Sequence, residues 1–114
     1  MKTRKELKEA YKQMKPQMGV FQIRNVTNNR VLVDASTDML SKWNRHRMEL
    51  TFGNHRNRSF QKDWNETEAA SFVFEILSEL KPSEEENPNY QKELQALREM
   101  VLEELKIPKD RLYS

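Results

Sequence analysis

The side chains best suited to chemistry lie between residues 42 and 62, where both histidines of the protein occur among lysines and arginines. Imidazole accepts and donates protons near neutral pH, so a histidine can act as a general acid or as a hydrogen-bond donor to phosphate. The basic side chains attract anions. This pattern favours a surface that faces phosphates, and its candidate residues are Lys42, Arg45, His46, Arg47, His55, Arg56, Arg58 and Lys62.

Structural roles compete with this interpretation. Solvated helix faces also carry charge clusters of this size. His46 lies beside Trp43 on one helical face and can pack in the core, whereas His55 lies in a loop and can fix a turn. Residues 83–104 are acidic and would repel phosphate, so charge is unevenly distributed in a chain whose net charge is only +2.

Two elements must position these side chains. Residues 19–36 contain two runs of strand-forming residues around Thr27-Asn28-Asn29, which predicts a β-hairpin. A helix should follow, capped by Ser36 or Thr37 and ended by Gly53-Asn54. One face of this helix carries Met39, Trp43, His46 and Leu50.

The remaining pattern predicts an α/β (α+β) fold, with a small three-stranded antiparallel sheet flanked by helices. Residues 2–15 are amphipathic, a short helix carries Phe60 and Trp64, and residues 72–77 form the third strand. After an acidic loop at 83–89, a last helix begins at Tyr90 and ends by Pro108.

Length and composition indicate one domain. The chain has 114 residues, is 36% hydrophobic and 33% charged, and contains no cysteine, which excludes disulfides and thiolate metal sites. We expect a lead-in at residues 1–18, the domain at 19–106 and a tail at 107–114. No secretory or membrane-length apolar segment is evident, so the expected location is the cytoplasm, without membrane contact.

An ordered set of residues resembles the GIY-YIG nuclease domain. The set begins with Gly19-Val20-Phe21-Gln22-Ile23 and the polar turn, and continues with Thr37-Asp38-Met39, Trp43, His46, His55-Arg56-Asn57 and Phe60-Gln61-Lys62-Asp63-Trp64. The resemblance implies hydrolysis of a DNA phosphodiester. In that family two tyrosines help to activate water, a helix arginine stabilises developing charge, and a glutamate on the last helix holds a divalent cation.

The positions that match this machinery are substituted. Phe21 and Leu32 stand at the two tyrosine positions, and Lys42 stands at the arginine position. Asp34 replaces a glycine, and Arg98 replaces the metal-binding glutamate. Because Asp34 and Arg98 carry opposite charges at positions that converge in the family, we hypothesise that they form an ion pair in the former metal site.

The resemblance and its substitutions together predict a nuclease fold that has lost hydrolysis and binds nucleic acid, most plausibly DNA, through the basic segment. No cofactor is then expected. One alternative is a protein-interaction or regulatory module. The other is a working endonuclease with a rearranged site, which would use Mg²⁺ or Mn²⁺ with His46 or His55 and with Asp34 or Glu99 as the metal ligand.

Overall fold

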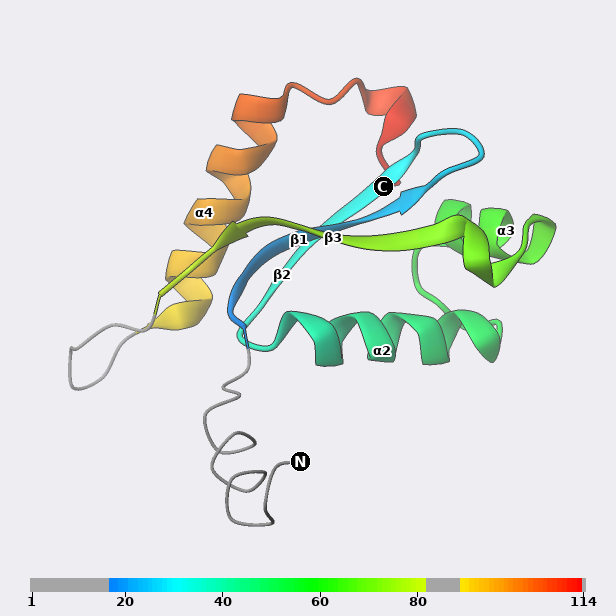
Figure 1. Cartoon of the computed structure of the whole chain (residues 1–114), viewed down its shortest axis with the longest axis horizontal. Coiled ribbons are helices and arrows are strands. Elements are labelled where there is room, and N and C mark those ends of the chain that lie inside the picture. Colours follow the sequence, from blue (N-terminus) through cyan, green and yellow to red (C-terminus); the bar gives the residue numbers. More distant parts are fainter. Residues whose placement is uncertain (1–16, 82–88, 114) are drawn as a thin grey trace, which may run out of the picture.

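The computed structural model describes residues 17–81 and 89–113 (Figure 1). The helix expected over residues 2–15 lies outside the described residues, as does the acidic loop apart from its last residue. No helix in the described ranges is long and apolar enough to cross a membrane.

Three antiparallel strands form one sheet, with β1 in the centre. The strands are β1 (Gly19–Asn25), β2 (Val31–Ser36) and β3 (Phe72–Glu79). The turn between β1 and β2 closes through Asn29, whose φ of 61° is a left-handed conformation that asparagine tolerates. Phe21 pairs with Asp34 across the hairpin, so both side chains emerge on the same face. The predicted α+β class with a three-stranded antiparallel sheet is confirmed.

Gly19 begins β1 where a side chain does not fit. A Cβ atom at this position would collide with the Ser78 carbonyl oxygen of β3. The pairing of β1 with β3 also shifts its register between Val20 and Phe21. The glycine therefore allows the two strands to stay in close contact beside this irregularity.

The helices of the described residues are α2 (Met39–Thr51), α3 (Arg58–Glu66) and α4 (Tyr90–Leu105), with short 3₁₀ turns η1 (Ala69–Ser71) and η2 (Lys109–Arg111). The predicted cap of α2 is wrong. Asp38 directly precedes the helix, and its carboxylate accepts a hydrogen bond from the Ser41 amide at 3.2 Å. The Ser36 hydroxyl instead contacts the backbone of Asp38.

The other helix ends follow local signals. The Asn57 side chain caps α3 by accepting a hydrogen bond from the Phe60 amide at 3.1 Å. At the far end of the chain, α4 stops at Leu105 because Lys106 adopts a left-handed conformation with φ of 48°. The helix thus ends before it reaches Pro108.

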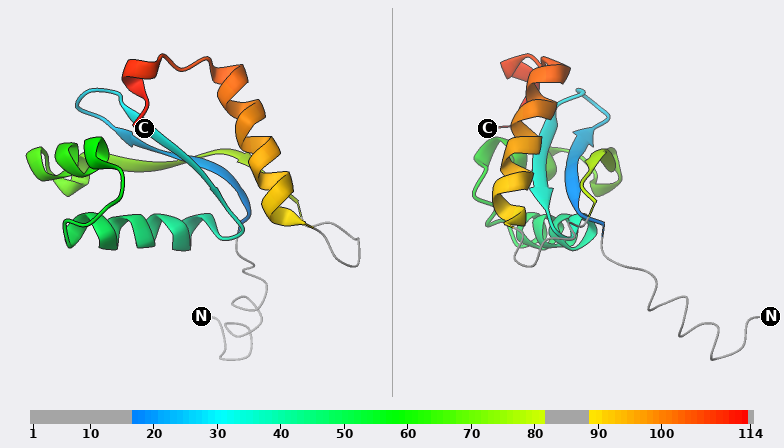
Figure 2. Two further views of the ribbon diagram at one scale, coloured as in Figure 1. Left: turned by 180° about the vertical axis from the view of Figure 1, so that it is seen from behind. Right: turned by 90° about the vertical axis from the view of Figure 1, so that its left-hand side faces the viewer.

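Helices lie on both faces of the sheet (Figure 2), and a hydrophobic core lies on each face. On one face Phe21 and Ile23 pack with residues of α2 and α3, namely Met39, Trp43, Leu50 and Phe60. On the other face Val31 and Val33 pack against Val101 of α4. Since side chains alternate along a strand, residues adjacent in β2 face different helices.

The segment after α4 returns to the hairpin. The amide of Tyr113 donates a hydrogen bond to the Val31 carbonyl at 2.9 Å, and the tyrosine ring lies 4.9 Å from that of Phe60. Tyr113 is buried within the core that α2 and α3 cover. The segment after α4 therefore contributes a side chain to this core.

Candidate functional site

A cleft of about 280 Å³ lies between β2, α2 and the loop that leads to α3, and it gathers most of the candidate side chains. Six of its residues were singled out from the sequence, and Glu49 joins them. The lining consists of Asp34, Lys42, Arg45, His46, Glu49, His55 and Arg56. The cleft thus combines imidazole, carboxylate and cationic groups within one small space.

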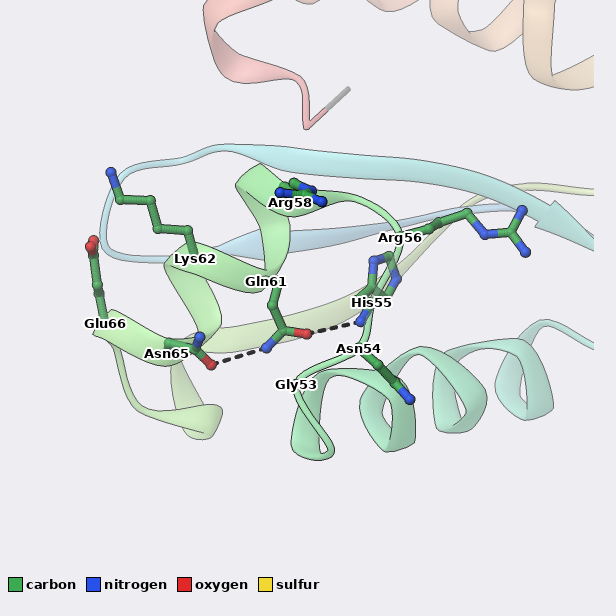
Figure 3. A pocket seen from close by; sticks show the side chains of 9 residues that line it. All are labelled: Gly53, Asn54, His55, Arg56, Arg58, Gln61, Lys62, Asn65 and Glu66. Carbon is green, nitrogen blue, oxygen red and sulfur yellow. Dashed lines mark hydrogen bonds between the residues drawn. The ribbon is translucent and has the colours of Figure 1, made fainter.

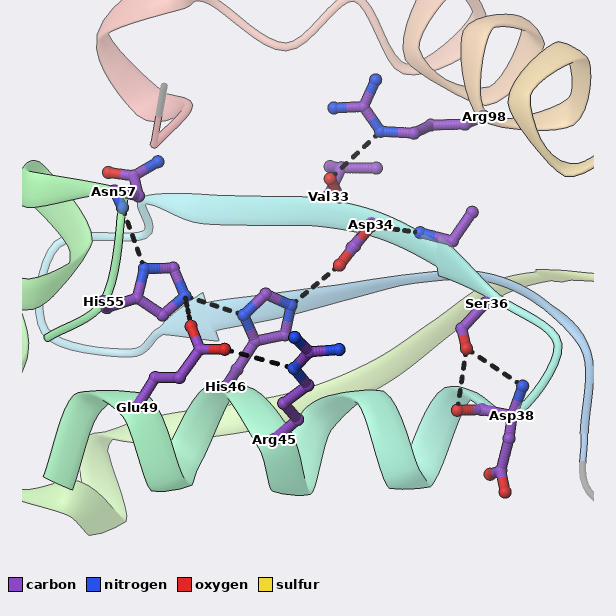
Figure 4. Close-up of polar contacts among 11 residues, drawn as sticks. Val33, Asp34, Ser36, Asp38, Arg45, His46, Glu49, His55, Asn57 and Arg98 are labelled. Atoms are coloured by element: carbon purple, nitrogen blue, oxygen red, sulfur yellow. Dashed lines mark hydrogen bonds and ion pairs between the residues drawn. The ribbon is translucent and has the colours of Figure 1, made fainter. Parts of the chain in front are cut away.

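A continuous line of hydrogen bonds crosses this cleft (Figure 4). Oδ2 of Asp34 lies 2.8 Å from Nε2 of His46, and Nδ1 of His46 lies 2.7 Å from Nε2 of His55. The backbone N–H of Asn57 then donates to Nδ1 of His55 at 3.0 Å. We call these four linked groups the histidine chain.

The backbone donor fixes the positions of the protons. An amide N–H can only donate, so Nδ1 of His55 accepts and the neutral ring carries its proton on Nε2. That N–H donates to Nδ1 of His46, which leaves the proton of His46 on Nε2. This second N–H donates to the Asp34 carboxylate. One assignment with two neutral rings satisfies every contact.

Burial and charge agree with this assignment. Burial lowers the pKa of His55, and the positive charge of a protonated His46 would lower it further, although Glu49 opposes the shift. Burial raises the pKa of Asp34, but hydrogen bonds from His46 and from the Ala35 amide, with the charge of Lys42, bring it below its ordinary value. Asp34 is therefore ionised at pH 7.

Gln61 of α3 holds the loop that carries His55. Its Oε1 accepts a hydrogen bond from the His55 amide at 3.1 Å. Its side-chain nitrogen donates to the Leu50 carbonyl and to Oδ1 of Asn65, both at 3.0 Å. These contacts use the full donor capacity of the buried amide and tie the loop to both flanking helices.

Aromatic rings pack against the two imidazoles. The ring of Phe60 lies 5.2 Å from that of His55 in an edge-to-face arrangement, and the ring of Phe21 lies 6.5 Å from that of His46. His46 is thus part of the site and not a fully buried core residue. Its side chain is 13% exposed.

A second and larger cavity of about 650 Å³ adjoins the first (Figure 3). Arg56 and His55 line both cavities, and α3 contributes Arg58 and Lys62 to the second. Arg47 lines neither cavity. Its guanidinium lies 5.8 Å from the centre of the Trp43 ring, so the structure separates it from the other candidates.

The two apolar replacements lie beneath the cleft and do not line it. Phe21 is fully buried, and Leu32 is partly buried against the same core. Their positions at the centre of the hairpin place them on the face that α2 covers. Neither side chain offers a group that can exchange a proton.

The hypothesised ion pair between Asp34 and Arg98 is wrong. No Asp34–Arg98 contact occurs within the 4.0 Å limit of an ion pair; Asp34 bonds to His46, and Nε of Arg98 donates to the Val33 carbonyl at 3.2 Å. Figure 4 shows the two side chains on opposite sides of β2. The alternation of side chains along this strand explains the separation.

The residues present do not fit the cation that the resemblance implies. Arg98 brings a positive charge to the position of the expected carboxylate, and it is bound to a backbone carbonyl. In the described part of the chain, no three histidine or acidic side chains are arranged to hold a metal ion.

Glu49, Asn57 and Gln61 contribute to the site, but the sequence analysis gave none of them a role in it. Glu49 lies one helical turn after His46, and its carboxylate is 4.0 Å from Nε2 of His55. That spacing is a signal that sequence inspection can find. The roles of Asn57 and Gln61 depend on the path of a loop, which no local pattern specifies.

Comparisons with known proteins agree with this architecture, although no known family model matches the sequence. The chain is 34% identical over 62 residues to the Intron-associated endonuclease 1 of Enterobacteria phage T4. The match covers 54% of this chain and 25% of that protein, so the chain spans about a quarter of the length of this relative.

Two solved structures are similar over most of the chain. The catalytic domain of the homing endonuclease I-TevI is 28% identical with a TM-score of 0.65, and the similarity covers 84% of this chain and 95% of that one. A mutant of this catalytic domain gives 26% identity and a TM-score of 0.69, with coverages of 86% and 92%.

The fold is that of a small α+β domain, similar to the catalytic domain of I-TevI. Within that class, the chain has the fold of the GIY-YIG nuclease domain, and the resemblance found in the sequence is confirmed.

Proposed function

We propose that the protein binds nucleic acid, most plausibly DNA, through the basic surface formed by α2, the following loop and α3. The observation that carries this proposal is a group of cations that have no carboxylate within 4 Å in the described residues. These cations are Lys42, Arg56, Arg58 and Lys62. By contrast, Arg24, Arg30 and Arg45 each form an ion pair.

Cations without protein partners suit a polyanion. Arg56 lies between the two cavities, so phosphates on either side of it can contact the same guanidinium. Phosphate contacts give affinity that depends strongly on salt and weakly on sequence. The similarity to proteins named as endonucleases supports a nucleic acid as the ligand.

We further propose that phosphodiester hydrolysis has been lost. A general base must accept a proton from water, but the acceptor nitrogen of each histidine already receives a hydrogen bond. The side chains at the positions matching the family tyrosines are a buried Phe21 and an apolar Leu32. The cleft retains cations that attract phosphate. It has no imidazole nitrogen free to accept a proton from water.

A titration of duplex and branched DNA, followed by fluorescence anisotropy at low and moderate salt, tests binding. The double variant Arg56→Glu with Arg58→Glu should weaken binding by more than about tenfold and reduce the salt slope by about two. The double variant Lys92→Glu with Lys109→Glu is the matched control, because it makes the same change in charge at two exposed residues that line neither cavity. Equal losses in both proteins, or no binding by the wild type at low salt, would contradict the proposal.

A second candidate is an endonuclease with a rearranged site. The contact between Asp34 and His46 favours it, because a carboxylate that orients an imidazole occurs in many acid–base sites. Plasmid nicking in Mg²⁺ or Mn²⁺, compared between wild type and His46→Ala, distinguishes the candidates. Nicking that the substitution abolishes would establish the endonuclease and reject the loss of hydrolysis.

A further inference from the structure

We infer that the cleft contains a phosphate subsite that Asp34 occupies, so that the carboxylate of this residue competes with a nucleic-acid phosphate for the same donors. The inference rests on the proposed function and specifies how one part of that surface is controlled. It concerns the smaller cavity, where Asp34 lies with His46, Lys42 and Arg56.

The first support is the direction of the histidine chain. The assignment of protons leaves one ring N–H hydrogen-bonded to a carboxylate, and this is Nε2–H of His46. Oδ2 of Asp34 accepts that hydrogen bond at 2.8 Å. A phosphate oxygen would have to take the place of this carboxylate oxygen to use the same donor.

The second support is that hydrogen bonds hold the Asp34 carboxylate in the cleft. Oδ1 of Asp34 accepts a hydrogen bond from the next amide in β2, that of Ala35, at 2.8 Å. The two carboxylate oxygens thus have different partners, one in the strand and one in the cleft. The side chain is 27% exposed, so it lies at the mouth of the site and not in the hydrophobic core.

The third support is electrostatic. The cleft has Lys42 and Arg56 without ion-pair partners in the described residues, whereas its other guanidinium, that of Arg45, lies 3.3 Å from Glu49. An incoming phosphate would meet attractive cations and, beside His46, a fixed negative charge. Two anions so close repel strongly where solvent is partly excluded. Removal of Asp34 should therefore strengthen binding, which is opposite to the usual effect of deleting a site residue.

Three variants separate this inference from general electrostatics. Asp34→Ala removes the charge and the acceptor, whereas Asp34→Asn removes the charge and keeps an acceptor for His46. Glu103→Gln makes the same charge change on the exposed surface of α4. We expect DNA affinity to rise by about tenfold for Asp34→Ala, to rise less for Asp34→Asn, and to stay within about twofold for Glu103→Gln.

A second measurement locates the effect. In a titration with inorganic phosphate followed by ¹⁵N NMR, the Nε2 resonance of His46 should shift in Asp34→Ala and stay constant in the wild type. Circular dichroism verifies folding of each variant. If Asp34→Ala does not fold, the nearly isosteric Asp34→Asn provides the same comparison with a smaller expected gain.

The outcomes distinguish this inference from the proposed function. If the wild type binds DNA and Asp34→Ala binds no more tightly, the subsite is rejected and nucleic-acid binding stands. Equal gains in Asp34→Ala and Glu103→Gln also reject it. If no protein binds DNA, the proposed function fails, and the phosphate titration decides the subsite: an unchanged His46 resonance in Asp34→Ala rejects it.

Discussion

The hydroxyl of Tyr113 donates a hydrogen bond to Oδ2 of Asp63 at 2.6 Å, which joins the C-terminal segment to α3. The same hydroxyl accepts a hydrogen bond from the side-chain amide of Asn25 at 3.1 Å, and the Arg30 guanidinium lies 4.3 Å from the ring centre. Burial and the contact with Asp63 raise the pKa of Tyr113 to about 12. The hydroxyl is therefore a permanent donor at neutral pH.

Replacement of this hydroxyl should destabilise the fold. Tyr113→Phe deprives Asp63 of a donor and leaves the fully buried Asn25 amide without its acceptor. We expect a loss of about 1–3 kcal/mol in the free energy of unfolding, because the hydrogen bond is charge-assisted. Urea unfolding measures the change. An unchanged midpoint would show that the C-terminal contacts do not contribute to stability.

The pH dependence of stability in alkaline solution tests the same hydroxyl independently. The pKa of Tyr113 is about 12 in the folded state, compared with an ordinary value of 10.0. Because the folded-state value is raised, the stabilisation is present below pH 10 and is lost as the pH rises through about 12. Tyr113→Phe should lose less stability than the wild type over this interval.

Stability should also fall in mild acid because of His55. Burial lowers its pKa from an ordinary value of 6.5, and the positive charges of Arg56 and of a protonated His46 act in the same direction, with Glu49 in opposition. A lowered folded-state pKa means that the unfolded chain binds more protons, so the stabilisation is complete above pH 6.5 and is lost as the pH falls through the folded value. The slope contributed by this one group is at most about 1.4 kcal/mol per pH unit.

Urea midpoints measured between about pH 5 and 8 test this dependence. His55→Gln removes the titrating group, so its curve should be flatter than that of the wild type even if its overall stability is lower. A variant curve parallel to that of the wild type would assign the acid sensitivity to other groups.

The histidine chain predicts one tautomer for each ring. At pH 7.5, long-range ¹H–¹⁵N spectra should show His46 and His55 both protonated on Nε2, because the Asn57 amide donates to Nδ1 of His55 and so sets the direction of the chain. In Asp34→Ala, His55 should keep its tautomer since its own amide partner remains. Protonation on Nδ1 of either ring would reverse the direction derived for the hydrogen bonds.

Gln61 should be more important for the loop than its position on α3 suggests. Gln61→Leu removes the partner of the His55 amide and of the Leu50 carbonyl, both of which are in a buried environment. Each unsatisfied group costs about 1–3 kcal/mol. The decrease in the free energy of unfolding should therefore be several times the decrease caused by a substitution at an exposed site. Gln91→Leu on α4 is the matched control, because Gln91 is exposed. Similar stabilities of the two variants would contradict the anchoring role.

The elements were predictable because their signals are local. The strand residues around Thr27-Asn28-Asn29 and the helical spacing of Met39, Trp43 and Leu50 specify the hairpin and α2 without knowledge of the rest of the chain. The basic residues of the site follow directly from these elements. Lys42, His46 and Arg56 accordingly line the cleft as a group.

The partners within the site were not predictable in the same way. Whether Asp34 meets His46 or Arg98 depends on which face of β2 each helix covers, and a change of one residue in a strand reverses the face. The contact of Tyr113 with Asn25 spans 88 positions in the sequence. Such distant contacts leave no periodic pattern, so only the assembled fold reveals them.

Asn57 has two tasks that are usually separate: its side chain begins α3, and its amide donates to His55. A change in the path of the backbone where this helix starts would therefore change which nitrogens of two imidazoles bear hydrogen. The polarity of a ligand-binding surface is in this way linked to a helix terminus. Anything that reshapes that terminus, including a bound molecule, would therefore change the hydrogen bond that the Asp34 carboxylate accepts from His46.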